Sequence, residues 1–334
     1  MPPTAAATTA TTPWTRCTPA PRSCATASTT TATAPATRRT PSAWYAAAAA
    51  APAETTAGRH CCLRCCWPGG TEMAELEEGI AGLAGYLAEA RHVLVFTGAG
   101  ISTGSGIPDY RGPQGVWKRR QPVYYQDFMS DEQKRLEYWE FALEGFSGYR
   151  DARPNAIHHA CVELERAGRL EMVVTQNIDG LHRKAGTSAE KLVEIHGTNL
   201  EVECQSCHRR DAPEEYFAYF ERERKPPLCR CGGFIKPATI SFGQSLRPED
   251  LERAGRAAAA ADLAISLGST LSVYPAAGIP QAAAARGIPY VVINRGPTEH
   301  DHLPELTLRL EGDVAEIFPP AVARALADGN RHPT

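Results

Sequence analysis

Two closely spaced cysteine pairs have the residue type and spacing of a metal site, and they comprise Cys204, Cys207, Cys229 and Cys231. The first pair is C-x-x-C, whereas the second has the single spacer Arg230. Such pairs predict one tetrahedral zinc ion, and the short pair can close on it if Arg230 lies in a turn that Gly232 and Gly233 permit. Four thiolates leave no coordination position for water or substrate, so we expect a structural zinc. The alternative is four free thiols.

A glycine-rich segment follows the buried apolar run HVLVF at residues 92–96. Gly98 and Gly100 would let the backbone approach a pyrophosphate, with the next helix pointing its N-terminus at it. The segment continues to residue 117 with many glycines, which predicts a mobile loop over a ligand. Arg111 could contact phosphate there, and Asp109 could orient a neighbour. The alternatives are a turn that binds nothing and a surface salt pair between Asp109 and Arg111.

Polar residues also follow four later apolar runs, at residues 172–175, 192–195, 263–267 and 290–293. They are Gln176, Asn177, Asp179 and His182, then His196, then Gly268, Ser269 and Thr270, and finally Asn294. Ligands of open α/β sheets bind beyond the carboxyl ends of strands, so these residues predict one dinucleotide-sized site. Amides and carboxylates suit a nucleoside sugar and a carboxamide, and His196 could be a general base. The alternatives are helix capping by Asn177 or Asp179 and a structural histidine.

The elements that must carry these residues alternate between strands and helices. Short apolar runs predict buried parallel strands at 92–96, 172–175, 192–195, 263–267, 290–293 and 306–310. Helical patterns cover residues 74–90, 158–167, 248–261, 276–286 and 313–327. This alternation predicts an α/β fold with a Rossmann-like, doubly wound parallel sheet. Residues 111–149, predicted to be helical, and residues 201–237, which hold the cysteines, interrupt it and would build a smaller inserted domain.

Composition restricts the remaining possibilities. Residues 1–72 are rich in Ala, Thr, Pro and Ser, which predicts a disordered low-complexity segment. It could instead be a transit peptide, or the start could be mis-assigned, because ordinary globular sequence begins at Met73. A net charge of −3 gives no surplus of basic residues for nucleic acid, and no apolar run is long enough to cross a membrane. The cysteine cluster and the Ala-, Arg-, Gly- and Pro-rich composition lead us to expect a bacterial cytoplasmic protein.

Together, these motifs resemble the sirtuin family of NAD-dependent protein deacylases. The matching stretches are GAGIS, GIPDYRG, QNIDGLH, the HG of EIHG, the C-x-x-C pair, FG, GST with SVYPAA, and INRG, in the family's order across residues 93–319. The resemblance implies a catalytic domain at 73–330. Its Rossmann-like part comprises residues 73–110, 168–200 and 238–330, with a helical module at 111–150 and a zinc ribbon at 201–237.

The resemblance also implies the site residues. NAD contacts fall on Gly98, Ala99, Gly100, Ser102, Asp109, Tyr110, Arg111, Gln176, Asn177, Ile178, Asp179, Gly268, Ser269, Asn294 and Val314. Within this set, Gln176 and Asn177 would contact the nicotinamide-side ribose, and Ile178 and Asp179 would hold the carboxamide. The resemblance implies three catalytic residues, which are His196, Asn177 and Asp179. An acyl-lysine peptide would thread as an added strand between two segments, Phe242 with Gly243 and Val273 with Tyr274.

The implied reaction consumes NAD. The acyl oxygen attacks C1′ of the ribose as nicotinamide departs, and His196, as base, deprotonates a ribose hydroxyl that attacks the imidate carbon. Free lysine and O-acyl-ADP-ribose result. Such an oxocarbenium-like transition state requires a site that orients the reactants and excludes water.

The sequence departs from the family's pattern at Tyr110, where most members have a phenylalanine that covers the nicotinamide pocket. DYRGPQGVW and ATISFGQ are more similar to the branch that includes nuclear deacylase and mono-ADP-ribosyltransferase members. Ala142 and Gly145 stand where the desuccinylase branch has its Tyr-x-x-Arg pair, so acidic acyl groups are not the expected substrate. The alternatives to deacylation are protein mono-ADP-ribosyl transfer and a non-catalytic NAD or ADP-ribose sensor. A cysteine ribbon that binds nucleic acid is disfavoured by the acidic residues between its two cysteine pairs.

Overall fold

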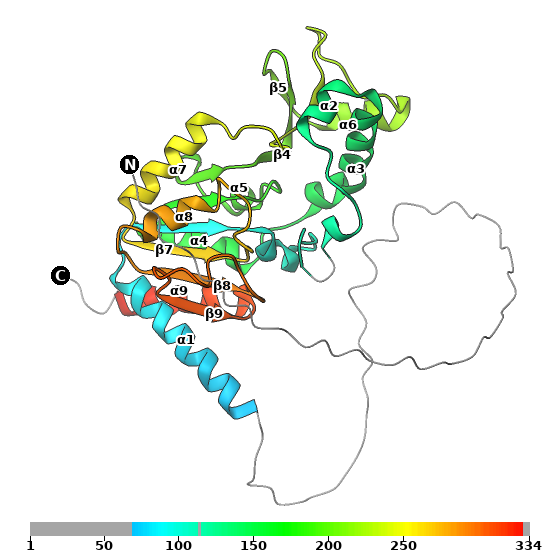
Figure 1. The fold of residues 1–334 in the computed structure, drawn as a ribbon. Helices are drawn as coiled ribbons and strands as arrows, with labels where there is room; N and C mark the ends of the chain where they lie inside the picture. The colour runs from blue at the N-terminus through cyan, green and yellow to red at the C-terminus, as the bar shows by residue number, and fades with distance from the viewer. Residues whose placement is uncertain (1–68, 113–114, 330–334) are drawn as a thin grey trace, which may run out of the picture. The chain divides into compact units, whose positions relative to one another are not determined.

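The computed structural model describes residues 69–112 and 115–329 of the chain (Figure 1). The predicted low-complexity segment 1–72 lies outside the described residues except for 69–72, which begin helix α1 (Gly69–Glu89). Among the described residues, no helix is both long and apolar enough to cross a bilayer.

Six parallel strands form the main sheet in the order β3-β2-β1-β7-β8-β9. They are β1 (Val93–Thr97), β2 (Leu170–Thr175), β3 (Leu192–Glu194), β7 (Leu263–Leu267), β8 (Tyr290–Asn294) and β9 (Leu308–Glu311). Strands β1, β7 and β8 are buried at every residue, which is why they read as unbroken apolar runs. The chain adds β2 and β3 on one side of β1 and then crosses to β7 on the other. The sheet therefore has its topological switch point between β1 and β7, where open α/β sheets bind ligands.

Helices cover both faces of this sheet (Figure 1). Besides α1, they are α4 (Ala156–Arg166), α7 (Pro248–Ala260), α8 (Gly278–Ala284) and α9 (Val314–Gly329). Val95 of β1 packs in a core with Leu83 of α1, whereas its neighbour Phe96 packs in the other core with Ala257 of α7. Successive residues of a strand point to opposite faces, so β1 carries both cores. The doubly wound architecture predicted from the sequence is confirmed, with strand ends that differ by one or two residues.

A second, antiparallel sheet has the order β5-β4-β6 and packs with three helices. Its strands are β4 (Gly197–Cys204), β5 (Arg210–Asp211) and β6 (Ile235–Thr239), and its helices are α2 (Tyr125–Ser130), α3 (Glu132–Asp151) and α6 (Glu214–Glu223). Trp139 of α3 is fully buried in their shared core, and its Nε1 donates a hydrogen bond to the Ile235 carbonyl at 3.0 Å. The two segments that interrupt the strand-helix alternation, far apart in sequence, thus share one core.

Helix α3 begins where the sequence supplies a strong N-cap. The Asp131 carboxylate accepts hydrogen bonds from the backbone N–H groups of Gln133 and Lys134, at 2.7 and 3.3 Å. These N–H groups have no partner inside the helix, so the cap stabilises its first turn. The segment predicted to be helical is therefore α3, the short helix α2 and a single 3₁₀ turn, η4 (Val116–Lys118).

Candidate active site

The backbone passes very close to itself at the switch point of the main sheet. The Gly100 N–H donates to the Gly268 carbonyl at 2.9 Å. A Cβ added to Gly98 would lie 2.7 Å from that carbonyl, and one added to Gly100 would lie 2.8 Å from it. Only glycine fits such an approach. The chain then enters a 3₁₀ helix, η3 (Ala99–Ser105), rather than an α-helix directly.

A buried polar network ties η3 to the segment after β2. Asn177 Nδ2 donates to the Gly98 carbonyl and to Ser102 Oγ, both at 3.1 Å. The Ser102 hydroxyl in turn donates to Asp179 Oδ2 at 2.7 Å. Burial raises the pKa of Asp179, whereas hydrogen bonds from the Leu181 N–H and from Ser102 lower it. The network holds an amide and a carboxylate side by side at the carboxyl edge of the sheet.

Asp179 also satisfies a backbone N–H at the start of a helix whose N-cap residue is Gly180, which is the role that the capping alternative gave it. Its Oδ1 accepts the Leu181 N–H at 2.9 Å, at the start of the short helix α5 (Leu181–Ala185). The two oxygens therefore have different partners, one in the helix and one in the polar network. Ile178, between Asn177 and Asp179, accepts the Asn199 N–H through its carbonyl at 2.8 Å.

The ends of the other strands meet at the same edge, as their parallel order requires. Gln176 Nε2 donates to Ser269 Oγ at 2.8 Å, which joins the segment after β2 to the segment after β7. At the end of β8, Asn294 Nδ2 donates to the carbonyls of Arg295 and Gly296, at 3.0 and 3.1 Å. Ser269 and Asn294 are both buried. These contacts and the strand order place Gln176, Ser269 and Asn294 along one edge of the sheet.

His196 follows β3 and points its ring at the neighbouring strand end. Its Nδ1 lies 3.1 Å from the Gln176 carbonyl oxygen, which can only accept a hydrogen bond. The proton therefore resides on Nδ1, and Nε2 carries the lone pair. Burial lowers the pKa of His196, and the bond to the Gln176 carbonyl opposes this in part. The ring is neutral at pH 7 and has the charge state of a general base.

The segment after η3 carries Asp109 and Arg111. Asp109 Oδ1 accepts the Gly112 N–H at 3.1 Å, so the carboxylate closes a local turn. Arg111 is exposed. Within the described residues, no ion pair joins the two, so the simple surface salt pair considered from the sequence is absent there.

An aromatic series connects this segment to the residues expected to bind peptide. The Tyr110 ring stacks on Trp117 with centroids 5.1 Å apart, and Trp117 meets the Phe242 ring edge-on at 6.1 Å. The Phe242 carbonyl accepts the Tyr125 N–H at 2.8 Å, and the Gly243 carbonyl accepts Gln126 Nε2 at 2.9 Å. The start of α2 therefore holds the backbone of both Phe242 and Gly243.

The second expected peptide segment lies beyond β7. The Val273 carbonyl accepts the Ala277 N–H at 2.9 Å. Tyr274 is 59% exposed, which is unusual for so large a ring. Its hydroxyl donates to Gln281 Oε1 at 3.3 Å. An exposed aromatic ring beside an irregular segment is available for contact with a ligand.

Two residues singled out from the sequence lie in the interior instead of along this edge. His182 is buried, its Nε2 is 3.2 Å from Thr97 Oγ1, and burial lowers its pKa well below the usual value. Val314 opens α9, and its side chain is buried in the core that α1, α4 and α9 share.

Asn155 is a functional candidate that the sequence analysis missed. Its Nδ2 donates to the Ile101 carbonyl at 2.8 Å and to Ser105 Oγ at 3.0 Å, so it holds both ends of η3. Its Oδ1 accepts the Ile157 N–H at 3.0 Å and caps α4. An Asn just before an apolar helical pattern is a recognisable N-cap signal, but the contact with η3 spans about fifty residues and has no local signal.

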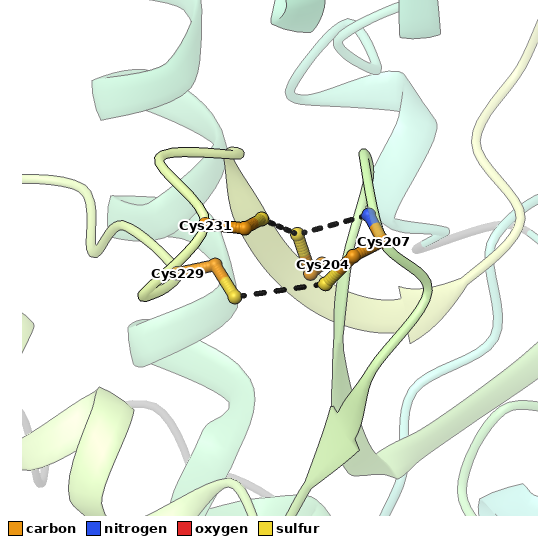
Figure 2. A group of neighbouring side chains, drawn as sticks. All are labelled: Cys204, Cys207, Cys229 and Cys231. Carbon is orange, nitrogen blue, oxygen red and sulfur yellow. Dashed lines mark hydrogen bonds between the residues drawn. The ribbon is translucent and has the colours of Figure 1, made fainter.

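The four cysteine sulfurs converge at the tip of the small sheet (Figure 2) and all lie within 4.8 Å of one another. Cys204 and Cys231 are 3.5 Å apart and Cys207 and Cys229 3.8 Å apart, sulfur to sulfur. A tetrahedral zinc with bonds of about 2.3 Å would separate its sulfurs by about 3.8 Å. Arg230 lies in a turn followed by Gly232 at a φ of 84°, as the sequence required of the short pair. The sulfur positions and the all-thiolate donor set fit one zinc ion.

Comparison with protein families matches residues 98–275 of the chain to the Sir2 family. The chain is 39% identical over 251 residues to NAD-dependent protein deacetylase 1 of Bradyrhizobium diazoefficiens, aligned over 75% of this chain and 97% of that protein. It is 38% identical over 259 residues to the NAD-dependent protein deacetylase of Caldivirga maquilingensis, over 77% of this chain and 98% of that protein.

Solved structures with the same fold include complexes. A Sir2 structure with p53 peptide and NAD⁺ is 35% identical, with a TM-score of 0.65 over 76% of this chain and 99% of that one. A Sir2 variant with deacetylated p53 peptide and 3′-O-acetyl ADP-ribose is 36% identical, with a TM-score of 0.67 over 75% of this chain and 98% of that one.

Proposed function

The chain belongs to the Sir2 family and is an NAD-dependent protein-lysine deacetylase, and we propose that His196 is the base of its reaction. NAD is its co-substrate, and an acyl-lysine protein or peptide is its partner. The reaction consumes NAD, the acyl-lysine and one water molecule, and it releases nicotinamide, O-acyl-ADP-ribose and the deacylated lysine side chain. The Nδ1 bond from His196 to the Gln176 carbonyl is the observation that carries the proposal, because it leaves Nε2 unprotonated.

His196 is suited to remove a proton from a ribose hydroxyl. A base must be unprotonated before the step, and burial lowers the pKa of this ring. The hydrogen bond to a backbone carbonyl fixes the ring plane and also stabilises the imidazolium that forms when the proton arrives. Gln176, which provides that carbonyl, and its neighbour Asn177 would contact the ribose whose hydroxyl is activated.

Asn177, Asp179 and Ser102 would hold the nicotinamide half of NAD. The Asp179 carboxylate and the backbone of Ile178 offer groups for a carboxamide, and Ser102 fixes the carboxylate by donating to it at 2.7 Å. Such groups are positioned before the ligand binds, so little reorganisation is needed in the reaction. Gly98, Ala99 and Gly100 would face the pyrophosphate, with Asp109 and Arg111 on that side, and the Tyr110 ring would cover the nicotinamide pocket. Gly268, Ser269 and Asn294 would serve the adenosine side, whereas Val314, whose side chain is buried in the core, could contribute there only through its backbone.

The peptide would add a strand between the Phe242–Gly243 and Val273–Tyr274 segments. The exposed Tyr274 ring and the Phe242 ring, which belongs to the aromatic series from Tyr110, support this assignment. Peptide and NAD would then contact the same aromatic cluster from opposite ends.

Zinc would be held by the four cysteines and would be structural, because four thiolates leave no position for substrate. The division of residues 73–330 into Rossmann-like, helical and ribbon parts is supported by the separate cores of the two sheets. A cytoplasmic location in a bacterium is supported by the reduced cysteine cluster and by the bacterial relatives.

Turnover with defined products tests the function. The full chain is incubated with NAD and a panel of acyl-lysine peptides, and the products are identified by mass spectrometry. We expect O-acyl-ADP-ribose and free lysine in equal amounts. His196→Ala should lower turnover by at least about a hundredfold while NAD binding remains detectable by calorimetry.

The same experiment separates the alternatives. ADP-ribose attached to protein without O-acyl-ADP-ribose would identify a mono-ADP-ribosyltransferase. NAD binding without any product would identify a sensor. Full turnover by His196→Ala would remove His196 from the role of base without contradicting the deacetylase function.

A further inference from the structure

We propose, on the basis of the function above, that Tyr149 is a positioning residue for Tyr110, the ring expected to cover the nicotinamide pocket. The two hydroxyl oxygens lie 3.1 Å apart, within hydrogen-bond distance. Tyr149 lies in the last turn of α3, 39 residues further along the chain. The tyrosine that replaces the family's usual phenylalanine at position 110 thus has a specific partner.

The Tyr110 ring is also held by a neighbouring aromatic ring. It stacks on Trp117 with an angle of 24° between the planes. Burial raises the pKa of its hydroxyl, the bond to Tyr149 lowers it, and the charge of nearby Asp179 raises it again. The hydroxyl is therefore protonated at neutral pH and can both donate and accept.

The helix end that carries Tyr149 is held by Lys184. Lys184 Nζ donates to the carbonyls of Tyr149, Arg150 and Ala152, at 2.8, 3.0 and 3.3 Å. These are carbonyls at the end of α3, where a cation is favourable because of the helix dipole. Lys184 belongs to α5, whose first residue, Leu181, donates its backbone N–H to Asp179. The end of α3 that carries Tyr149 is thus joined to α5, which directly follows the segment expected to bind nicotinamide.

The hydroxyl pair should act on ligand binding more than on chemistry. A phenylalanine at position 110 would retain the stack on Trp117 and lose the link to α3. The ring would then occupy its covering position in a smaller fraction of free molecules. Apparent affinity falls by that fraction for any ligand that requires the ring in place. The ligands concerned are NAD and nicotinamide, whereas the acyl-lysine peptide contacts other residues.

The test is a double-mutant cycle with Tyr149→Phe, Tyr110→Phe and the double variant, each in the full chain. The expected effect of one lost hydrogen bond is a roughly fivefold rise in the KM for NAD and in the inhibition constant for nicotinamide. Both single variants should show the same rise, and the double variant should show no more. The change in kcat should be smaller than the change in KM.

Tyr216→Phe is the matched control, because it also removes one hydroxyl hydrogen bond in the small domain, to Asp211 at 2.7 Å. It should leave both constants unchanged. The positioning role of Tyr149 is contradicted if Tyr149→Phe binds NAD and nicotinamide as the wild type does. It is also contradicted if the effects of the two substitutions on these constants add in the double variant. NAD affinities measured by calorimetry give the same comparison without turnover. If the wild type proved inactive, the proposed function would be contradicted, but these affinities would still test the role of the Tyr110–Tyr149 hydrogen bond. Melting temperatures identify any variant that loses affinity by unfolding.

Discussion

At the scale of single residues, His196 makes the reaction depend on pH in a defined direction. The base must be neutral, and burial lowers its pKa from 6.5. Its neutral form therefore persists below pH 6.5, and kcat/KM should stay level from pH 8 to 6.5 and fall only at lower pH. A profile of kcat/KM against pH reports the essential groups of the free enzyme.

Asp179 could contribute to the same fall of kcat/KM at low pH (the acid limb of the profile), because burial raises its pKa from 3.8. The profile of Asp179→Asn separates the two groups. If the limb belongs to His196, it should appear in this variant at the same pH, although at lower activity. A wild-type limb centred at or above pH 6.5 would mean that His196 is not the buried neutral base that its surroundings require.

Residue identities at the strand ends could be predicted from the sequence, but their partners could not. Gln176, Asn177 and Asp179 follow a recognisable apolar run, and parallel strands bring such ends to one edge. The bond between Tyr110 and Tyr149 depends on where α3 ends, and nothing in the local pattern fixes that. His182 belongs to the same motif, yet α5 turns its ring into the interior beneath Thr97.

At the scale of elements, the cysteine cluster determines how the small sheet ends. Cys204 is the last residue of β4 and pairs with Ile235, the first residue of β6. A zinc ion here would join the two strands where they meet and so fix β6, which leads to Phe242 and Gly243. A three-stranded sheet with so small a core depends on such a link.

Removal of zinc should therefore unfold the small sheet and abolish deacetylation. Incubation with a strong chelator should release one zinc ion per chain and lower the circular dichroism signal of the small sheet, while the larger sheet remains folded. Added zinc should restore activity, which distinguishes metal loss from irreversible damage. A metal-free protein that stays folded and active would contradict the structural role.

The elements of the main sheet were easier to predict than those of the small one. Strands β1, β7 and β8 are buried on both faces and so appear as apolar runs. Strand β4 is only partly buried and carries Glu201 and Glu203, and β5 has just two residues. No apolar period marks such strands, because the cysteines and ion pairs around them supply part of the stabilisation.

At the scale of the whole catalytic domain, charged side chains connect the two sheets. Arg183 of α5 pairs with Glu194 of β3 and with Glu201 of β4. Arg210 of β5 pairs with Glu201 and also with Glu203, at 2.9 and 3.0 Å. The strand that begins directly after His196 therefore carries two carboxylates that link the small sheet to the large one. Their geometry contributes to the position of the peptide segments relative to the NAD site.

Glu203 is the central member of this network, and its neutralisation should destabilise the domain. Its side chain is only 13% exposed, and its Oε2 also accepts a hydrogen bond from Arg247 Nη2 at 2.5 Å. Arg247 is the residue just before α7. Glu203→Gln would leave the positive charges of Arg210 and Arg247 without the carboxylate that they share. We therefore expect a loss of about 2 kcal/mol in the free energy of unfolding. Glu252→Gln removes the exposed pair with Arg256 and should cost less than about 0.5 kcal/mol. Melting temperatures should differ accordingly, by about 4–8 °C for Glu203→Gln. Equal, small shifts for both variants would mean that packing alone joins the sheets.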